Sequence, residues 1–195
     1  MGAAYLIGSV QPGLIVVKLV MQLDVRTLGS GRTGMTNVLR TAGKRAAAVV
    51  LVADVGKGLA LALAARLLSD DPILHAAAGT AVIVGHVWPV FAGFRGGRGI
   101  ATGFGTSLGL DPWAGLAGLA AFLPLVGLTR FVSLGSVAAV LAVGAAFVVR
   151  AALFGAPLAY LGYALVGATL IIAMHRDNIR RLVRGEERRL GERPA

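Results

Sequence analysis

Six long apolar runs restrict this chain more than any other feature. Each run has at least 18 residues: Ala3–Leu23, Ala46–Leu68, Ile73–Phe94, Pro112–Thr129, Phe131–Val149 and Leu153–Met174. A helix needs about 20 residues to cross roughly 30 Å of hydrocarbon. The runs lack strand alternation, and lipid is crossed only by helices or closed barrels. The sequence therefore predicts an all-α integral membrane protein.

The composition excludes most other classes. Apolar residues make up 56% of the chain and charged residues only 14%, whereas soluble domains carry about 25% charged residues. The absence of cysteine excludes disulfides and thiolate metal sites. The net charge of +10 fits either nucleic-acid binding or positive charge on the cytoplasmic side of a membrane. The positions of the cations decide between these two interpretations.

A shorter apolar segment, Ile100–Leu110, determines the expected topology. Lys and Arg concentrate in segments 24–45 and 94–99, at Arg130 and after Met174. If the chain crosses the membrane at Ile100–Leu110, all of these cations lie on one side, which the positive-inside rule makes cytoplasmic. Without that crossing, the arginine-rich tail would lie opposite the first basic loop. We therefore expect seven transmembrane helices, with the N-terminus outside and the C-terminus cytoplasmic.

We expect one polytopic membrane domain over residues 1–195, with a basic cytoplasmic tail over 175–195. Basic charge beside a transmembrane helix is attracted by anionic lipid headgroups. We therefore expect anionic lipid, and no nucleic acid, as the partner of this face.

The first polar cluster is the glycine-rich segment from Gly29 to Arg40. Glycines allow tight turns and close approach of backbone N–H groups to a ligand. Ser30, Thr36 and Asn37 offer hydrogen bonds, and the Arg40 guanidinium matches a phosphate. The segment could form an anion-binding nest, or it could be a loop whose arginines face lipid headgroups.

The second cluster runs from Gly85 to Thr102. Arg95 and Arg98 flank a glycine pair, and an apolar segment begins directly after Gly99. The N–H groups at the start of such a helix favour a phosphate. His86 lies within an apolar run, where it is either functional or a hydrogen-bonding partner between helices.

The third cluster follows the last apolar run. His175 and Asn178 are three residues apart and so share a helical face, although the segment could also be an ordinary basic tail. Asp54 and Lys57 are spaced to pair with each other, and Lys57 is in addition a candidate for an anionic site. Ser133 is a weaker candidate ligand. No His is followed by Asp in the H-x-x-x-x-D pattern of many acyltransferases.

Together the clusters resemble the bacterial acyl-phosphate:glycerol-3-phosphate acyltransferase family (PlsY). The likeness covers nearly the whole chain and rests on three ordered motifs, G-S-G-N-x-G-A-T-N-x-x-R, G-H-x-x-P-x-F-x-x-F-K-G-G-K-G-x-A-T and H-x-x-N-I-x-R-L-x-x-G-x-E. The residues that match are Gly29, Ser30, Gly31, Gly34, Thr36, Asn37, Arg40, Gly85, His86, Pro89, Phe91, Phe94, Gly96, Gly97, Gly99, Ala101, Thr102, His175, Asn178, Ile179, Arg181, Leu182, Gly185 and Glu187. Asp54, Lys57 and Gly58 also resemble the family's D-x-x-K-G.

The chain departs from the family's pattern at several positions. Arg32 and Met35 stand where the family usually has Asn and Ala, and Arg95 and Arg98 replace lysines. The segment from Gly8 to Gly13 only partly follows the family's G-S-I-P-x-G.

The resemblance implies transfer of a fatty acyl chain from acyl phosphate to the 1-hydroxyl of glycerol 3-phosphate, giving lysophosphatidate and phosphate. It implies no cofactor or metal, and location in the bacterial cytoplasmic membrane; we expect a monomer. The implied catalytic residues are Ser30, Asn37, Arg40 and His175, the last as a candidate general base in competition with an oxygen of the acyl phosphate. Glu187 is expected to pair with an arginine and fix the tail. The implied substrate-binding residues are Thr36, Lys57, His86, Arg95, Gly96, Gly97, Arg98, Gly99, Thr102, Ser133 and Asn178.

Two other functions stay open at this stage. A small organic-phosphate transporter would use the same basic clusters as a vestibule, and an inactive, divergent homologue would explain Arg32 and Met35. A carrier normally places polar groups near the membrane midplane, and here most of them lie towards one face.

Overall fold

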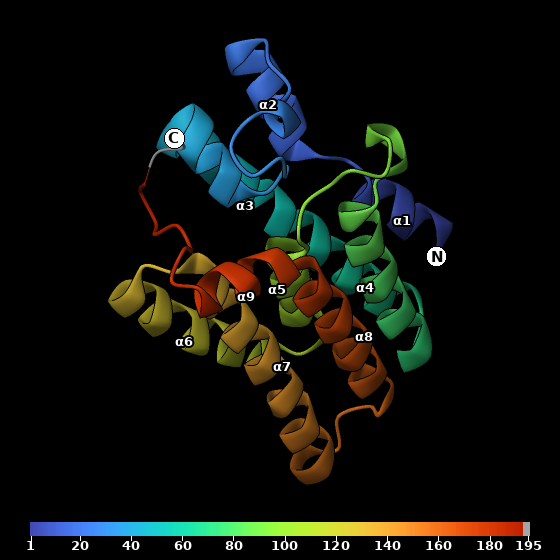
Figure 1. Cartoon of the computed structure of the whole chain (residues 1–195). Helices are drawn as coiled ribbons and strands as arrows, with labels where there is room; N and C mark the ends of the chain where they lie inside the picture. Colours follow the sequence, from blue (N-terminus) through green and yellow to red (C-terminus); the bar gives the residue numbers. More distant parts are fainter. Residues whose placement is uncertain (193–195) are drawn as a thin grey trace.

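The computed structural model describes residues 1–192, and over that range every regular element is a helix (Figure 1). The elements in chain order are α1 (Gly2–Gly8), α2 (Pro12–Met21), η1 (Val25–Thr27), α3 (Met35–Leu68), α4 (Pro72–Val87), η2 (Val90–Ala92), α5 (Ile100–Leu110), α6 (Pro112–Thr129), α7 (Val132–Phe154), α8 (Ala159–Met174) and α9 (Arg176–Val183). The all-α prediction is confirmed for this range. Residues 193–195 of the expected tail, including Arg193, lie outside the described residues.

Most of the expected transmembrane runs appear as long apolar helical segments. Five segments are long and apolar enough to cross a membrane, and α8 with α9 makes a sixth if this pair, bent by 59°, is counted as one. The segment Ile100–Leu110 forms a helix, α5, but its 11 residues are too few to cross an average bilayer without help from neighbours.

Two expected runs are interrupted. The first is broken between Gly8 and Pro12, so that α1 and α2 are separate helices. The third ends as a helix at Val87, because Pro89 follows and the residue before a proline is driven out of helical geometry. The second begins earlier than expected, at Met35, and contains a break at Gly43, which has φ 85°.

Prolines start three of the α-helices, and aspartates cap two of these. Pro12, Pro72 and Pro112 each occupy the first turn of a helix, where the missing N–H costs nothing. The Asp71 carboxylate accepts a hydrogen bond from the Ile73 N–H at 2.9 Å, and Asp111 caps α6 in the same way.

Helix α5 runs through the interior of the bundle (Figure 1) and contacts α3, α4, α6, α7 and α8. Its backbone meets that of α3 directly, because a Cβ at Gly58 or Gly105 would clash with a carbonyl of the other helix. At its end, Arg66 of α3 donates to the Gly109 carbonyl at 2.9 Å, and Arg150 of α7 pairs with Asp111 at 2.6 Å.

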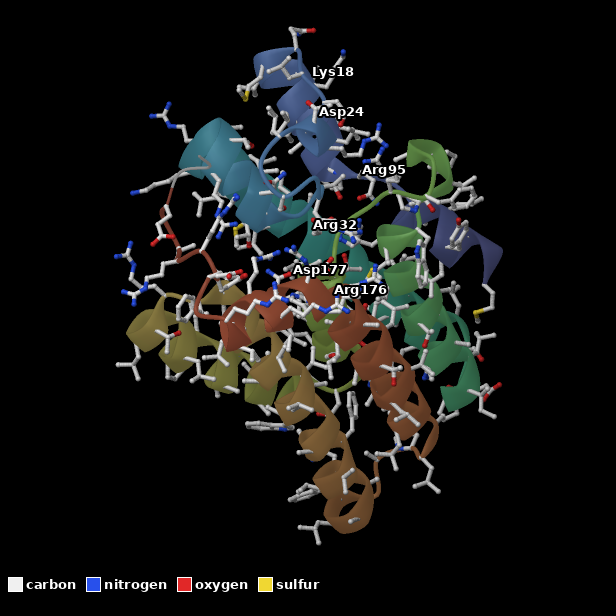
Figure 2. All side chains as sticks on the ribbon, in the orientation of Figure 1. Lys18, Asp24, Arg32, Arg95, Arg176 and Asp177 are labelled. Atoms are coloured by element: carbon white, nitrogen blue, oxygen red, sulfur yellow. The ribbon has the colours of Figure 1, made fainter. Side chains whose placement is uncertain are left out.

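Apolar and charged side chains occupy different parts of the protein surface. Large apolar side chains such as Leu19, Val52, Leu67, Leu128 and Leu165 lie exposed on the helices, as expected for a lipid-facing surface and not for a water-facing one. In the orientation of Figure 2, Arg95 and Arg32 lie in the upper half of the molecule and Arg176 lies near its middle.

Candidate active site

Residues of all three polar clusters meet at one cavity of about 340 Å³. The first cluster contributes from the start of α3 and the loop before it, the second from the start of α5, and the third from the α8–α9 junction and the tail. Figure 2 shows Arg32 of the first cluster above Asp177 and Arg176 of α9. The predicted site residues in its lining are Ser30, Thr36, Asn37, Arg40, His86, Arg98, Gly99, Ser133, His175, Asn178 and Glu187.

The side chain of Asn37 shapes the glycine-rich loop. Its Oδ1 accepts from the Ser30 N–H at 2.9 Å, and its Nδ2 donates to the carbonyls of Val25, Leu28 and Arg32 at 2.9–3.2 Å. Gly29 has φ +57°, and a Cβ there would clash with Asn37 Oδ1. The amide predicted to be catalytic is therefore occupied by the loop, which it holds in place.

Two helix N-termini face the cavity. Gly34, Met35 and Thr36 line it at the start of α3, and Gly99 and Ile100 line it at the start of α5. The N–H groups of a first helical turn have no partner within the helix, and the helix dipole makes this end positive. The cavity is therefore suited to anions on two sides.

Three arginines add positive charge to the cavity: Arg32, Arg40 and Arg98. Burial and the neighbouring Arg32 lower the pKa of Arg98 to about 10, so its guanidinium stays charged at neutral pH. The Nε atoms of Arg40 and Arg98 are buried and have no hydrogen-bond partner among residues 1–192. Such groups are costly unless paired, and a phosphate would satisfy them.

Glu187 ties the tail to the cavity wall. It accepts hydrogen bonds from Ser133 Oγ at 2.9 Å, Asn178 Nδ2 at 2.7 Å and Arg181 Nε at 2.7 Å. Burial acts to raise the pKa of Glu187, but these hydrogen bonds hold it below its ordinary value. The expected pairing with an arginine is found in the Arg181 contact.

His175 lies between α8 and α9 with one ring nitrogen already occupied. Its Nδ1 is 2.8 Å from the Ile171 carbonyl, which requires the proton on Nδ1 and leaves Nε2 as an acceptor. Burial, together with the charge of Arg98, lowers the pKa of His175 to about 4. A general base acts best when its pKa is near the working pH, so the lowered pKa of His175 disfavours the general-base hypothesis.

Asp54, Lys57 and His86 form a buried polar group. Lys57 Nζ lies 2.9 Å from both Asp54 Oδ1 and His86 Nδ1. Lys57 also donates to the carbonyls of Gly8 and Val10, at the break between α1 and α2. Asp54 and His86 reach the cavity, whereas Lys57 does not. The expected pairing of Asp54 with Lys57 is present, and Lys57 fills the break between the helices.

Five predicted binding residues lie outside the cavity lining: Lys57, Arg95, Gly96, Gly97 and Thr102. The Arg95 side chain is exposed to solvent. Gly96 and Gly97 pack against His86, with no room for a Cβ at either. Thr102 is fully buried, and its carbonyl faces Gly58. The two glycines therefore position the loop.

The site residues predicted from the sequence do not include Arg32 or the residues of the apolar part of the cavity. Arg32 lies within the first motif, so its position was a usable signal. The apolar lining includes Phe104, Leu119, Phe122 and Val140 of α5, α6 and α7, and further residues of α3, α4 and α8. Uniformly apolar helices carry no sequence mark that separates a lipid-facing position from a cavity-facing one.

Comparison with known proteins assigns this arrangement to a family. The family model described as glycerol-3-phosphate acyltransferase matches residues 1–185. Glycerol-3-phosphate acyltransferase 3 of Dehalococcoides mccartyi is 42% identical over 97% of this chain and 94% of its own length. The glycerol-3-phosphate acyltransferase of Rubrobacter xylanophilus is 43% identical over 97% of this chain and 92% of its own length.

Two solved structures are also similar. The glycerol 3-phosphate form of PlsY, an integral membrane glycerol 3-phosphate acyltransferase, has a TM-score of 0.88 and 36% identity, covering 97% of this chain and 92% of that one. The lysophosphatidic acid form has a TM-score of 0.85 and 35% identity, covering 96% and 92%.

Proposed function

Because this chain belongs to the glycerol-3-phosphate acyltransferase family, it is a membrane acyltransferase, and we propose that its cavity holds acyl phosphate and glycerol 3-phosphate together. The acyl chain passes from the first to the 1-hydroxyl of the second. The products are lysophosphatidate and inorganic phosphate.

Glycerol 3-phosphate takes the part of the cavity between α5 and the α8–α9 junction. Arg98 and the first turn of α5 bind its phosphate. Asn178 Oδ1 is buried without a hydrogen-bond partner in the described part of the chain and accepts from a glycerol hydroxyl. His175 Nε2 is a second neutral acceptor, which orients the 1-hydroxyl. One charged site and two neutral acceptors match a ligand with one phosphate and two hydroxyls.

Acyl phosphate takes the opposite side. Ser30, Thr36, Arg40 and the first turn of α3 hold its phosphate, with Arg32 between the two anions. Its hydrocarbon chain lies in the apolar part of the cavity, beside Phe122 of α6. Holding both substrates in one cavity removes much of the entropic barrier to their reaction.

The transfer needs no covalent enzyme intermediate. The 1-hydroxyl oxygen bonds to the carbonyl carbon, the bond from that carbon to the phosphate oxygen breaks, and the hydroxyl proton leaves. Arginines and helix N–H groups stabilise the negative charge that develops. Phosphate esters have a second pKa of about 6, whereas the pKa of His175 is lowered to about 4. The departing phosphate is therefore the better proton acceptor, and His175 orients.

The placement of α5 supports seven crossings. Its start lies at the cavity with the start of α3, and its end lies beside Arg66, near the end of α3. An 11-residue helix is about 16 Å long, and the surrounding helices shield its short ends. The basic cavity face is then cytoplasmic, in contact with anionic lipid, and the N-terminus lies outside. The protein forms a single domain, monomeric, in the bacterial cytoplasmic membrane.

One observation carries the proposal: a single cavity has an arginine-rich part and an apolar part. Detergent-purified protein given acyl phosphate and glycerol 3-phosphate should release phosphate and form lysophosphatidate. A transporter would instead move glycerol 3-phosphate into vesicles without releasing phosphate, and an inactive homologue would do neither.

A further inference from the structure

Two buried side chains outside the cavity connect the loops that carry its arginines. Gln11, between α1 and α2, is 4% exposed, and Thr33, in the glycine-rich loop, is 1% exposed. Thr33 Oγ1 donates to Gln11 Oε1 at 2.6 Å, and Gln11 Nε2 donates to the His86 carbonyl at 3.2 Å. Neither residue lines the cavity.

The same His86 carbonyl anchors the second loop. It also accepts from the Gly97 N–H at 3.1 Å. Gly97 precedes Arg98, and Thr33 follows Arg32, so the hydrogen-bonded path from Thr33 through Gln11 and His86 to Gly97 ends beside a cavity-lining arginine at each end. The side chain of His86 is itself fixed by Asp54 and Lys57.

We propose that Gln11 is a positioning residue that, through Thr33 and the His86 carbonyl, fixes the spacing of Arg32 and Arg98 for phosphate binding. Two guanidinium groups that face one cavity repel each other. Without a rigid connection their loops relax apart, and a phosphate must then bring them back together. That cost appears as weaker binding of the anion.

We call the hydrogen-bonded path from Thr33 through Gln11 to the His86 carbonyl the bridge. The close packing around it leaves the two loops little freedom to adopt another arrangement. A Cβ at Gly13 would clash with the Thr33 carbonyl, so the first turn of α2 lies directly against the loop. Nearer to solvent, Arg26 donates to the Ala92 carbonyl at 2.6 Å and joins the same two loops. Loss of the buried bridge should therefore loosen the loops without separating them, and the variants should fold.

Binding of glycerol 3-phosphate by isothermal titration calorimetry tests the bridge, with steady-state kinetics on the same samples. The variants are Gln11→Ala, Thr33→Val, their combination and Thr33→Ser. Thr80→Val is the matched control, because it removes a hydroxyl that bonds only within α4, to the Ala76 carbonyl. A neutral hydrogen bond corresponds to roughly a three- to tenfold change in affinity.

We expect Gln11→Ala and Thr33→Val each to weaken glycerol 3-phosphate binding and raise its KM by that factor, with kcat within about twofold. The combined variant should match the worse single one, because both remove one connection. Thr33→Ser should retain wild-type affinity, and Thr80→Val should change nothing.

Unchanged affinity in both single variants would overturn the proposal. So would additive effects, failure of Thr33→Ser to bind normally, or a fall in kcat that follows the thermal midpoint. If Gln11→Ala does not fold, Thr33→Val decides alone. The role of Gln11 rests on glycerol 3-phosphate being the proposed substrate, but the experiments distinguish failure of this role from failure of the proposed function. Wild-type protein that binds glycerol 3-phosphate without transferring an acyl chain refutes only the proposed function. Wild-type protein that binds no glycerol 3-phosphate refutes the bridge as well.

Discussion

Arg98 shows how burial and charge combine at single residues of this cavity. It is largely removed from water, and burial with the nearby Arg32 lowers its pKa to about 10. The carboxylate that acts to raise the pKa of Arg98 is Glu187, and it already accepts hydrogen bonds from Ser133, Asn178 and Arg181. The three arginines of the cavity therefore leave an excess of positive charge there, which a bound anion would neutralise.

Replacement of Arg98 by Ala should raise the KM for glycerol 3-phosphate by about 10- to 100-fold, because a charge-assisted hydrogen bond contributes roughly 1.5–3 kcal/mol. Steady-state kinetics of phosphate release at varied glycerol 3-phosphate measures this. Arg180→Ala is the control, since the Arg180 side chain is 72% exposed; equal effects of the two variants would remove Arg98 from the site.

The lowered pKa of His175 predicts that the stability of the folded protein depends on pH. Its folded-state pKa of about 4 lies below the ordinary value of 6.5, so the unfolded chain binds the extra proton first as pH falls. Above pH 6.5 the imidazole is neutral in both states and the folded protein keeps its full stability. Between pH 6.5 and 4 protonation favours the unfolded chain, so the free energy of unfolding falls. The thermal midpoint in detergent should fall over this window, and His175→Gln should flatten the fall. An equal slope in both proteins would contradict the assignment.

At the scale of elements, the contact between α3 and α5 places one arginine-bearing loop beside the other. It depends on Gly58 and Gly105, where the two backbones touch. Any side chain there would push α5 outward and move Arg98 with it. Small residues at such contacts allow helices in a membrane to approach closely.

Gly58→Ala should destabilise the protein by about 1–3 kcal/mol, because the added methyl group overpacks the contact with Thr102. Gly56→Ala, on the same helix with nothing within 4 Å of the new methyl group, should be neutral or slightly stabilising. Thermal midpoints in detergent compare them, and a midpoint for Gly58→Ala as high as for Gly56→Ala would refute the close contact.

The whole molecule joins two environments in one cavity. Polar loops from three distant parts of the chain supply the charged part, and helices α3 to α8 supply the apolar part. The tail closes the arrangement, because the Leu190 N–H donates to the Arg130 carbonyl at 2.7 Å and Arg40 donates to the Arg188 carbonyl at 3.3 Å. Under the proposed function, all of these parts are needed to hold the two substrates together.

Ala139→Phe should narrow the apolar part of the cavity, which Ala139 of α7 lines. Activity with long-chain acyl phosphate should fall about tenfold or more relative to short-chain acyl phosphate, with little change in the KM for glycerol 3-phosphate. Val148→Phe places the same side chain on an exposed part of α7 and should leave the preference unchanged. An unaltered chain-length preference in Ala139→Phe would show that the acyl chain lies elsewhere.

The sequence by itself determined the helical class, the main apolar runs and the three polar clusters, because hydrophobic length and local glycine and arginine patterns depend on neighbours in the chain. It also led to the family, through motifs that span nearly the whole sequence. The resemblance implied Arg95, Gly96, Gly97 and Thr102 as substrate-binding residues, whereas the structure places Arg95 in solvent and the other three in packing contacts.

Only the tertiary structure decided which polar groups are free to bind. Asn37 is occupied by its own loop, the proton of His175 is fixed by the Ile171 carbonyl, and Gln11 meets Thr33 across 22 positions of the chain. Burial and hydrogen-bond occupancy depend on atoms from distant segments, so a local pattern cannot specify them. A local pattern also cannot specify the apolar part of the cavity. This part exists because helices with similar apolar sequences leave space between them when they pack.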